Sequence, residues 1–157
     1  MTIKQICLAV PVSLLVLGHA AVKADTTIDD AGSLACVTDK WDEKEVAKGH
    51  KLADWAARCI AIPDNPDAPK YTEECAGKYE FRPDESWKGT AKCTWKFKDG
   101  DEVHDTFEEG SHLKESTYVI TGGTGKYQGA SGGGIYSCET LTDVLCGGKY
   151  KGRMQLP

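Results

Sequence analysis

The feature that most constrains the fold is a glycine-rich stretch at residues 121–134, TGGTGKYQGASGGG, in which seven of the fourteen residues are glycine. Glycine adopts positive φ readily and permits close backbone approach, and it weakens any helix or strand that it interrupts. Apolar residues at 118–120 and 135–136 flank the stretch. We therefore interpret it as a corner of a closed β-sheet, where a strand bends sharply and then resumes.

Two nucleotide-binding motifs share the composition of this stretch, but neither fits its spacing. A phosphate-binding loop ends in Gly-Lys followed by Ser or Thr, whereas Lys126 is followed by Tyr127. The same motif needs a glycine at position 120, which holds Ile120, and the dinucleotide fingerprint needs one at Gln128. No helical pattern follows either match, so the sequence argues against a nucleotide site.

Residues 1–24 have the pattern of a secretory signal peptide. Lys4 is the charged start, residues 6–17 form an apolar run, and Ala24 is a suitable end for cleavage before Asp25. The apolar run is shorter than the roughly 20 residues that a membrane-spanning helix needs. We therefore expect a secreted or periplasmic protein without a membrane span.

Cleavage would leave one domain, residues 25–157. The net charge of −5 then becomes −7, because the removed segment holds Lys4 and Lys23 and no acidic residue. A negative domain is poorly suited to nucleic acid or to anionic membrane surfaces, so we expect neither as a partner. The sequence leaves the oligomeric state open.

Six cysteines remain after Cys7 is removed with the signal peptide: Cys36, Cys59, Cys75, Cys93, Cys138 and Cys146. An even number in a small exported chain indicates disulfides. The absence of a C-x-x-C pair argues against a zinc ribbon or a thioredoxin-like site. We expect a Cys138–Cys146 bridge first, because it brackets a short connection, and a Cys59–Cys75 bridge second, because it flanks the proline-rich loop at residues 63–69.

Alternating apolar and polar residues predict β-strands over most of the chain after residue 78. The clearest ones cover residues 92–98, 102–109, 113–121, 135–138 and 147–156. Residues 50–62 fit either a strand or a helix, and we favour a strand. Residues 25–50 predict a short irregular or helical lead-in. Short strands separated by turn signals are typical of a sandwich or a barrel.

The glycine-rich stretch also resembles a known family. Residues 122–132 match the GGTG-x-[aromatic]-x-x-A-x-G signature of the allene oxide cyclase and dirigent barrels, and Gly122, Gly123, Gly125, Gly129 and Gly132 are its glycines here. The stretch is more similar still to small bacterial secreted proteins grouped with that class. The resemblance implies an all-β fold: one antiparallel, up-and-down, lipocalin-like barrel of about eight strands around a cavity, here stapled by disulfides.

The resemblance implies a class of function through the cavity. Allene oxide cyclases fold a reactive fatty-acid epoxide in theirs, and dirigent proteins orient radicals or quinone methides. Only the structural glycine signature matches, so no catalytic residue can be transferred. We expect the barrel to bind a small apolar or aromatic molecule without a cofactor. Two alternatives stay open: an enzyme of the cyclase or isomerase type, and a structural or interaction protein with a filled barrel.

Candidate site residues follow from the strand at residues 102–109, whose apolar face also carries Asp105 and Glu109. Burial of a carboxylate raises its pKa, so these two acids are the candidate catalytic residues. The candidate ligand-binding residues are Arg58, Tyr79, Trp95, Phe107 and Tyr118. The histidines show no spaced metal-binding pattern, so we expect no metal site.

Overall fold

The computed structural model describes residues 26–157, which form a β-barrel. The strands are β1 (Thr26–Ala47), β2 (His50–Pro63), β3 (Tyr71–Phe81), β4 (Trp87–Phe97), β5 (Glu102–Gly110), β6 (Ser116–Gly123), β7 (Ser131–Thr140) and β8 (Leu145–Leu156), with a 3-10 turn, η1 (Gly125–Tyr127), between β6 and β7. The predicted signal peptide, residues 1–24, lies outside the described residues. Within residues 26–157, no helix has the length and apolar character needed to cross a membrane.

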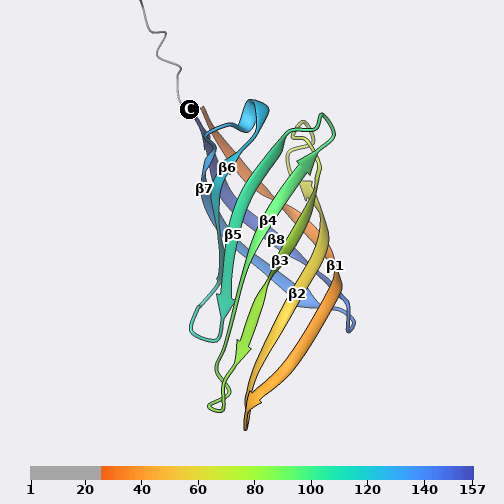
Figure 1. The fold of residues 1–157 in the computed structure, drawn as a ribbon. Coiled ribbons are helices and arrows are strands. Elements are labelled where there is room, and N and C mark those ends of the chain that lie inside the picture. The colour runs from red at the N-terminus through yellow and green to blue at the C-terminus, as the bar shows by residue number, and fades with distance from the viewer. Residues whose placement is uncertain (1–25) are drawn as a thin grey trace, which may run out of the picture.

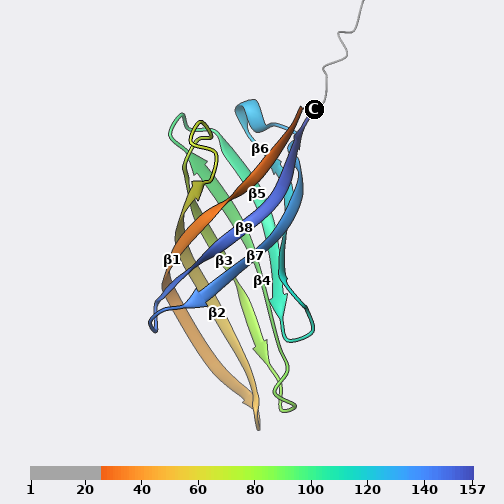
Figure 2. The ribbon, with the colours of Figure 1, turned by 180° about the vertical axis from the view of Figure 1, so that it is seen from behind.

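All eight strands are antiparallel to their neighbours and follow the order of the chain around the barrel (Figure 1). The sheet closes where β1 pairs with β8 from Thr26↔Leu156 to Val37↔Leu145, and these strands lie side by side with β7 in Figure 2. The prediction of an all-β, up-and-down barrel is therefore confirmed.

The first strand corrects the expectation for the N-terminal part of the domain. The irregular or helical lead-in predicted for residues 25–50 is wrong, because β1 covers most of this segment. Its buried inward positions hold Asp30, Gly32 and Cys36, so the apolar alternation that identifies a strand is missing. Backbone pairing with both β2 and β8 imposes the extended conformation instead.

Three disulfides connect neighbouring strands: Cys36–Cys59 joins β1 to β2, Cys75–Cys93 joins β3 to β4, and Cys138–Cys146 joins β7 to β8. The predicted Cys138–Cys146 bridge is confirmed, whereas the predicted Cys59–Cys75 bridge is wrong. Cys59 lies directly opposite Cys36, and Cys75 directly opposite Cys93, so each meets its cross-strand partner before any other thiol. Each bridge contributes roughly 2–4 kcal/mol to the free energy of unfolding.

The glycine-rich stretch connects two neighbouring strands rather than bending one. It forms the end of β6, the η1 turn and the start of β7. Gly125 has φ +52, and a Cβ at this position would lie 1.8 Å from a carboxylate oxygen of Asp101. Asp101 in turn accepts the backbone N–H of Lys126 at 3.2 Å. A side chain at Gly125 would therefore break the contact that holds the turn against the β4–β5 connection.

The η1 turn closes one end of the barrel interior. Tyr127 is 4% exposed, and its ring stacks on Phe97 with the centroids 4.5 Å apart. The core behind it consists of Ala61, Tyr71, Trp95, Phe97, Val103, Tyr118, Ile120, Ala130, Tyr150 and Met154. This filled half lies at the end of the barrel that carries η1 and the C-terminus in Figure 1.

At the other end, the β1–β2 hairpin projects past the barrel (Figure 1). β1 pairs with β8 as far as Val37, but it pairs with β2 as far as Ala47. Residues 39–49 are all exposed. We call this projecting part the β1–β2 ribbon. Its β2 strand also pairs with β3 from Lys51↔Phe81 onward, whereas its β1 strand forms an edge of the sheet.

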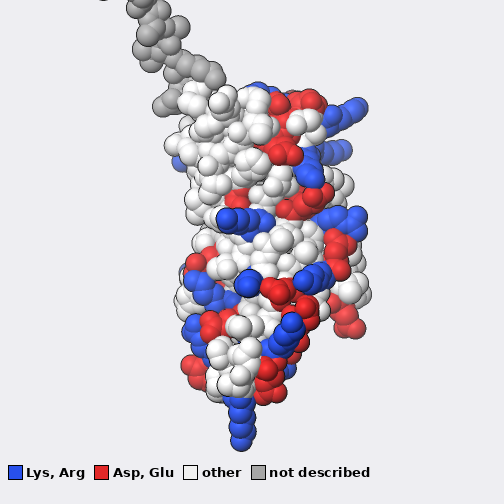
Figure 3. Space-filling view, viewed as in Figure 1, with Lys and Arg blue, Asp and Glu red and all other residues white. Residues whose placement is uncertain are grey.

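The outer surface carries interspersed acidic and basic residues (Figure 3). Many of them pair between adjacent strands, as in Arg58–Asp39, Lys96–Glu74 and Lys88–Glu108. Exposed pairs of this kind add about 0–1 kcal/mol each, so they favour solubility and strand register more than stability.

We expect Gly132→Ala to lower the free energy of unfolding by at least about 2 kcal/mol. Gly132 has φ +123, and an added Cβ would lie 2.1 Å from the backbone oxygen of Arg153, so the β7–β8 pairing would have to shift. The control is Gly100→Ala, where φ is +91 but no atom lies within 4 Å. Urea unfolding measures both variants, and equal losses would contradict the role of close strand approach.

Candidate functional site

The half of the interior that the core does not fill is a cavity of about 630 Å³. All four tryptophans of the chain line it: Trp41, Trp55, Trp87 and Trp95. Trp41 and Val144, which are 46% and 53% exposed, also belong to its wall. The cavity therefore opens to solvent near the β1–β2 ribbon and the β7–β8 connection.

Aromatic side chains form much of the cavity wall because the inward positions of β2, β3 and β5 hold them. Trp55 contacts Tyr79 and Phe107 edge to face, with ring centroids 5.8 and 5.6 Å apart. The ring centroids of Trp41 and Tyr79 are 5.2 Å apart. Edge-to-face pairs of this kind fix ring positions, so these rings form a shaped wall.

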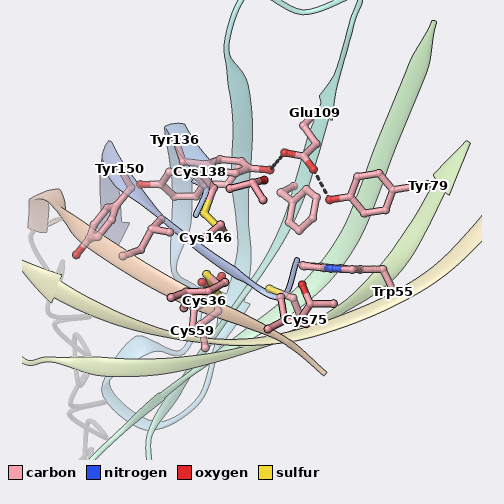
Figure 4. A pocket seen from close by; sticks show the side chains of 18 of the residues that line it. Cys36, Trp55, Cys59, Cys75, Tyr79, Glu109, Tyr136, Cys138, Cys146 and Tyr150 are labelled. Carbon is pink, nitrogen blue, oxygen red and sulfur yellow. Dashed lines mark hydrogen bonds between the residues drawn. A yellow bond between two sulfur atoms is a disulfide. The ribbon is translucent and has the colours of Figure 1, made fainter. Parts of the chain in front are cut away.

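Glu109 lies between two tyrosines in the wall (Figure 4). The hydroxyl of Tyr136 donates to Glu109 Oε2 at 3.0 Å, and the hydroxyl of Tyr79 donates to Oε1. Burial raises the pKa of both tyrosines well above the usual value, and the neighbouring Glu109 raises it further. Both phenols therefore stay protonated and hold the carboxyl in one orientation.

The cavity ends against four aromatic residues of the core, Tyr71, Trp95, Tyr118 and Tyr150, which we call the cavity floor. Tyr71 and Trp95 stack with their centroids 4.6 Å apart. Three carboxyl groups lie among these rings: Asp30 from β1, Glu73 from β3 and Asp105 from β5.

The three floor carboxyl groups differ in their hydrogen bonds. Asp30 accepts the hydroxyl of Tyr118 at 3.0 Å, and Glu73 accepts the indole N–H of Trp95 at 3.1 Å. Asp105 is 3% exposed, and its Oδ1 has no hydrogen-bond partner among the described residues. A buried acceptor without a partner costs roughly 1–3 kcal/mol, so Asp105 is poised to accept a donor.

Burial raises the pKa of all three floor acids. The pKa of Asp30 rises to about 6, partly offset by the hydrogen bond from Tyr118. The pKa of Glu73 also rises, first because of burial and then because of the neighbouring Asp105. Burial likewise raises the pKa of Asp105, although the nearby indole N–H of Trp95 lowers it in part. Groups with such pKa values exchange protons near neutral pH.

The structure brings most of the predicted site residues into one cavity. Its wall includes both candidate acids, Asp105 and Glu109, and the candidate ligand-binding residues Tyr79, Trp95, Phe107 and Tyr118. Arg58 is placed elsewhere: it lies on the outer surface and donates to both carboxylate oxygens of Asp39 at 2.7 Å. The expectation that Arg58 contributes to the cavity is therefore wrong, because its position in β2 alternates outward from Trp55 and Cys59.

Two site residues, Asp30 and Glu73, were not predicted from the sequence. Asp30 belongs to the strand that the sequence did not reveal. A signal for Glu73 existed: the inward alternation of Tyr79 continues back through Cys75 to Tyr71 and places Glu73 on the same face.

Potential metal ligands meet in two places within the described residues. Cys36, Cys138 and Cys146 form one group, and Glu73, Cys75 and Cys93 form the other. Every cysteine in these groups belongs to a disulfide. Metal binding by cysteine requires a thiolate, so neither group fits a metal site while the disulfides are intact.

No model of a known protein family and no curated protein matches this chain in sequence. Solved structures do match in fold. One pterocarpan synthase dirigent protein has a TM-score of 0.53 at 13% identity, with 84% of this chain and 91% of that protein covered. Another has a TM-score of 0.55 at 13% identity, with 83% and 96% covered. A pyocyanin demethylase has a TM-score of 0.48 at 19% identity, with 78% and 98% covered.

The two dirigent matches span most of both chains, and their low identity limits them to a statement about the fold. The chain thus has a dirigent-type barrel fold, as the glycine signature indicates.

The floor acids predict an unusual pH dependence of stability. Their pKa values are higher in the folded protein than in the unfolded chain, so the folded state binds more protons between about pH 4 and pH 8. The free energy of unfolding should therefore fall as pH rises through this range, by on the order of a few kcal/mol.

Urea unfolding between pH 5 and pH 8 measures this effect. Asp105→Asn removes one of the titrating groups and should flatten the slope. Hydrogen bonds from basic side chains lower the pKa values of outer-surface acids such as Asp39 and Glu108. These acids therefore titrate below pH 5 and do not affect the slope of stability between pH 5 and pH 8. Stability that rises with pH from 5 to 8, or an unchanged slope in Asp105→Asn, would contradict the prediction.

Proposed function

We propose that the protein binds a small apolar or aromatic molecule inside its barrel. The observation that carries the proposal is the cavity of about 630 Å³ with its aromatic wall. Binding sites for small molecules typically enclose about 300–1,000 Å³, and they combine apolar walls with a few polar groups. The carboxyl groups of Asp105 and Glu109 supply such polar groups here.

The proposal includes export from the cytoplasm. It rests on the signal-peptide pattern of residues 1–24 and on the three disulfides, which persist in oxidising compartments. A barrel in the periplasm or outside the cell would encounter its ligand there. Mass determination of the exported chain tests this part, with Asp25 as the expected first residue.

Ligand binding is directly observable because every tryptophan lines the cavity. Titration with neutral phenols, naphthalene derivatives and fatty acids should give a saturable change in tryptophan fluorescence for at least one compound. The same compound should raise the unfolding temperature, since it binds the folded state. A panel in which no compound produces either effect would overturn the proposal.

Two neighbouring positions in β1 provide a matched pair of variants. Thr38 lines the cavity, whereas Val37 points outward and is 43% exposed. Thr38→Trp should weaken binding at least about tenfold by occupying the entrance, and Val37→Trp should leave binding unchanged. Calorimetry measures both affinities, and equal effects would place the ligand outside the cavity.

An enzyme of the cyclase or isomerase type is the second candidate, and the fixed position of Glu109 favours it. Two tyrosine hydroxyls orient this carboxyl in the wall, as general acid–base catalysis requires. Glu109→Gln should then abolish turnover of a bound substrate while leaving the unfolding temperature within a few degrees of the wild-type value. Glu108→Gln, on the outer face of the same strand, is the control, and full turnover by Glu109→Gln would exclude this role.

The third candidate was a structural or interaction protein with a filled barrel. Side chains fill the half of the interior nearest η1, but the other half holds the cavity. The geometry therefore favours a binding function over this alternative.

A further inference from the structure

The charge of the cavity wall differs from that of the outer surface. Glu73, Asp105, Glu109 and Asp143 line the cavity, and within residues 26–157 no lysine, arginine or histidine does. On the outside, acids such as Asp39, Glu74 and Glu108 have basic partners within 4.0 Å. The acids of the cavity wall therefore lack the counter-charge that the same residue types have on the outside.

Asp105 shows where a counter-charge would be held. It is 3% exposed and lines the cavity, and its Oδ1 has no hydrogen-bond partner among the described residues. Buried polar atoms in folded proteins nearly always have a partner, and one left without a partner calls for an explanation. A donor supplied by a bound molecule at the cavity floor would complete this oxygen.

The surroundings of Asp105 suit a positive charge on an aromatic molecule. Asp105, Phe107 and Glu109 are successive inward positions of β5, so an aromatic ring lies between two acids on one strand. Trp95 and Tyr118 of the cavity floor lie on the adjacent strands. Aromatic faces attract cations, most strongly when water is excluded.

We infer that the ligand of this cavity is a cationic aromatic molecule, such as an arylalkylammonium or a protonated nitrogen heterocycle, whose N–H donates to Asp105 at the floor. This inference rests on the proposed function and specifies its ligand class. A ligand carboxylate would add negative charge to a wall that offers no basic partner, which argues against fatty acids. A neutral phenol would fill the aromatic wall but leave the acids without counter-charge.

Three probes of one size test the inference: naphthalen-2-ylmethylammonium, naphthalen-2-ylmethanol and 2-naphthoate. Calorimetry at pH 7.5 should give an affinity for the ammonium at least about tenfold higher than for the alcohol, because the charge gains hydrogen bonding and cation–π contact. The naphthoate should bind most weakly.

Asp105→Asn should reduce the affinity for the ammonium to that for the alcohol, and it should leave the affinity for the alcohol unchanged. Glu108→Gln removes an outward-facing acid from the same strand and should alter neither. If Asp105→Asn fails to fold, Asp105→Ser, which also removes the carboxylate, replaces it, with the same expected loss of preference.

The outcomes separate the inference from the proposed function. Equal binding of the ammonium and the alcohol, or a preference that survives in the variant, overturns the inference and leaves the proposed function intact. Binding of none of the three probes overturns the inference, and the proposed function falls with it only if the wider panel of phenols, naphthalene derivatives and fatty acids also fails to bind. Calcium chloride is a further arm: if it raises the unfolding temperature and blocks the ammonium, the floor is a metal site and the inference is wrong.

Discussion

The pairing of β1 with β8 is the constraint on which the rest of the structure depends. It closes the sheet, so that every second residue of each strand faces a single enclosed interior. In an open sheet, the side chains of Asp30, Glu73 and Asp105 could turn toward water. Closure instead collects them among tyrosine and tryptophan rings, and the raised pKa values of these acids follow from that enclosure.

The interior is divided into a packed core and a cavity because side chains close only one end of the barrel. At one end the η1 turn inserts Tyr127 against Phe97, and bulky residues pack behind it. At the other end small or polar inward residues, such as Thr38 and Thr140, leave space. The wall of that space includes the sulfur atoms of disulfides, so the crosslinks also hold the spacing of the strands around it.

Strands with alternating apolar residues could be predicted from the sequence, and so could the inward face of β5 with Asp105 and Glu109. β1 could not, because Asp30 and Gly32 occupy positions where apolar residues would have marked a strand, and only pairing with β2 and β8 makes it extended. The Cys59–Cys75 error has the same origin, since Cys36 becomes the partner of Cys59 only once β1 is recognised. The outward position of Arg58 required the register of β2.

The unpaired edge of β1 in the β1–β2 ribbon bears on whether copies of the protein associate with one another. Beyond Thr38, whose N–H donates to the Val144 carbonyl at 2.8 Å, the side of β1 that faces away from β2 has no strand beside it in the described residues. Its outward backbone N–H and C=O groups are therefore available for pairing. Such an edge can recruit another chain and seed aggregation. Charged residues, among them Lys40, Asp42, Lys44 and Glu45, occupy this segment and are exposed. Pairing of this edge with another chain would remove water from these charges at a cost in free energy, and this cost opposes fibre-like assembly.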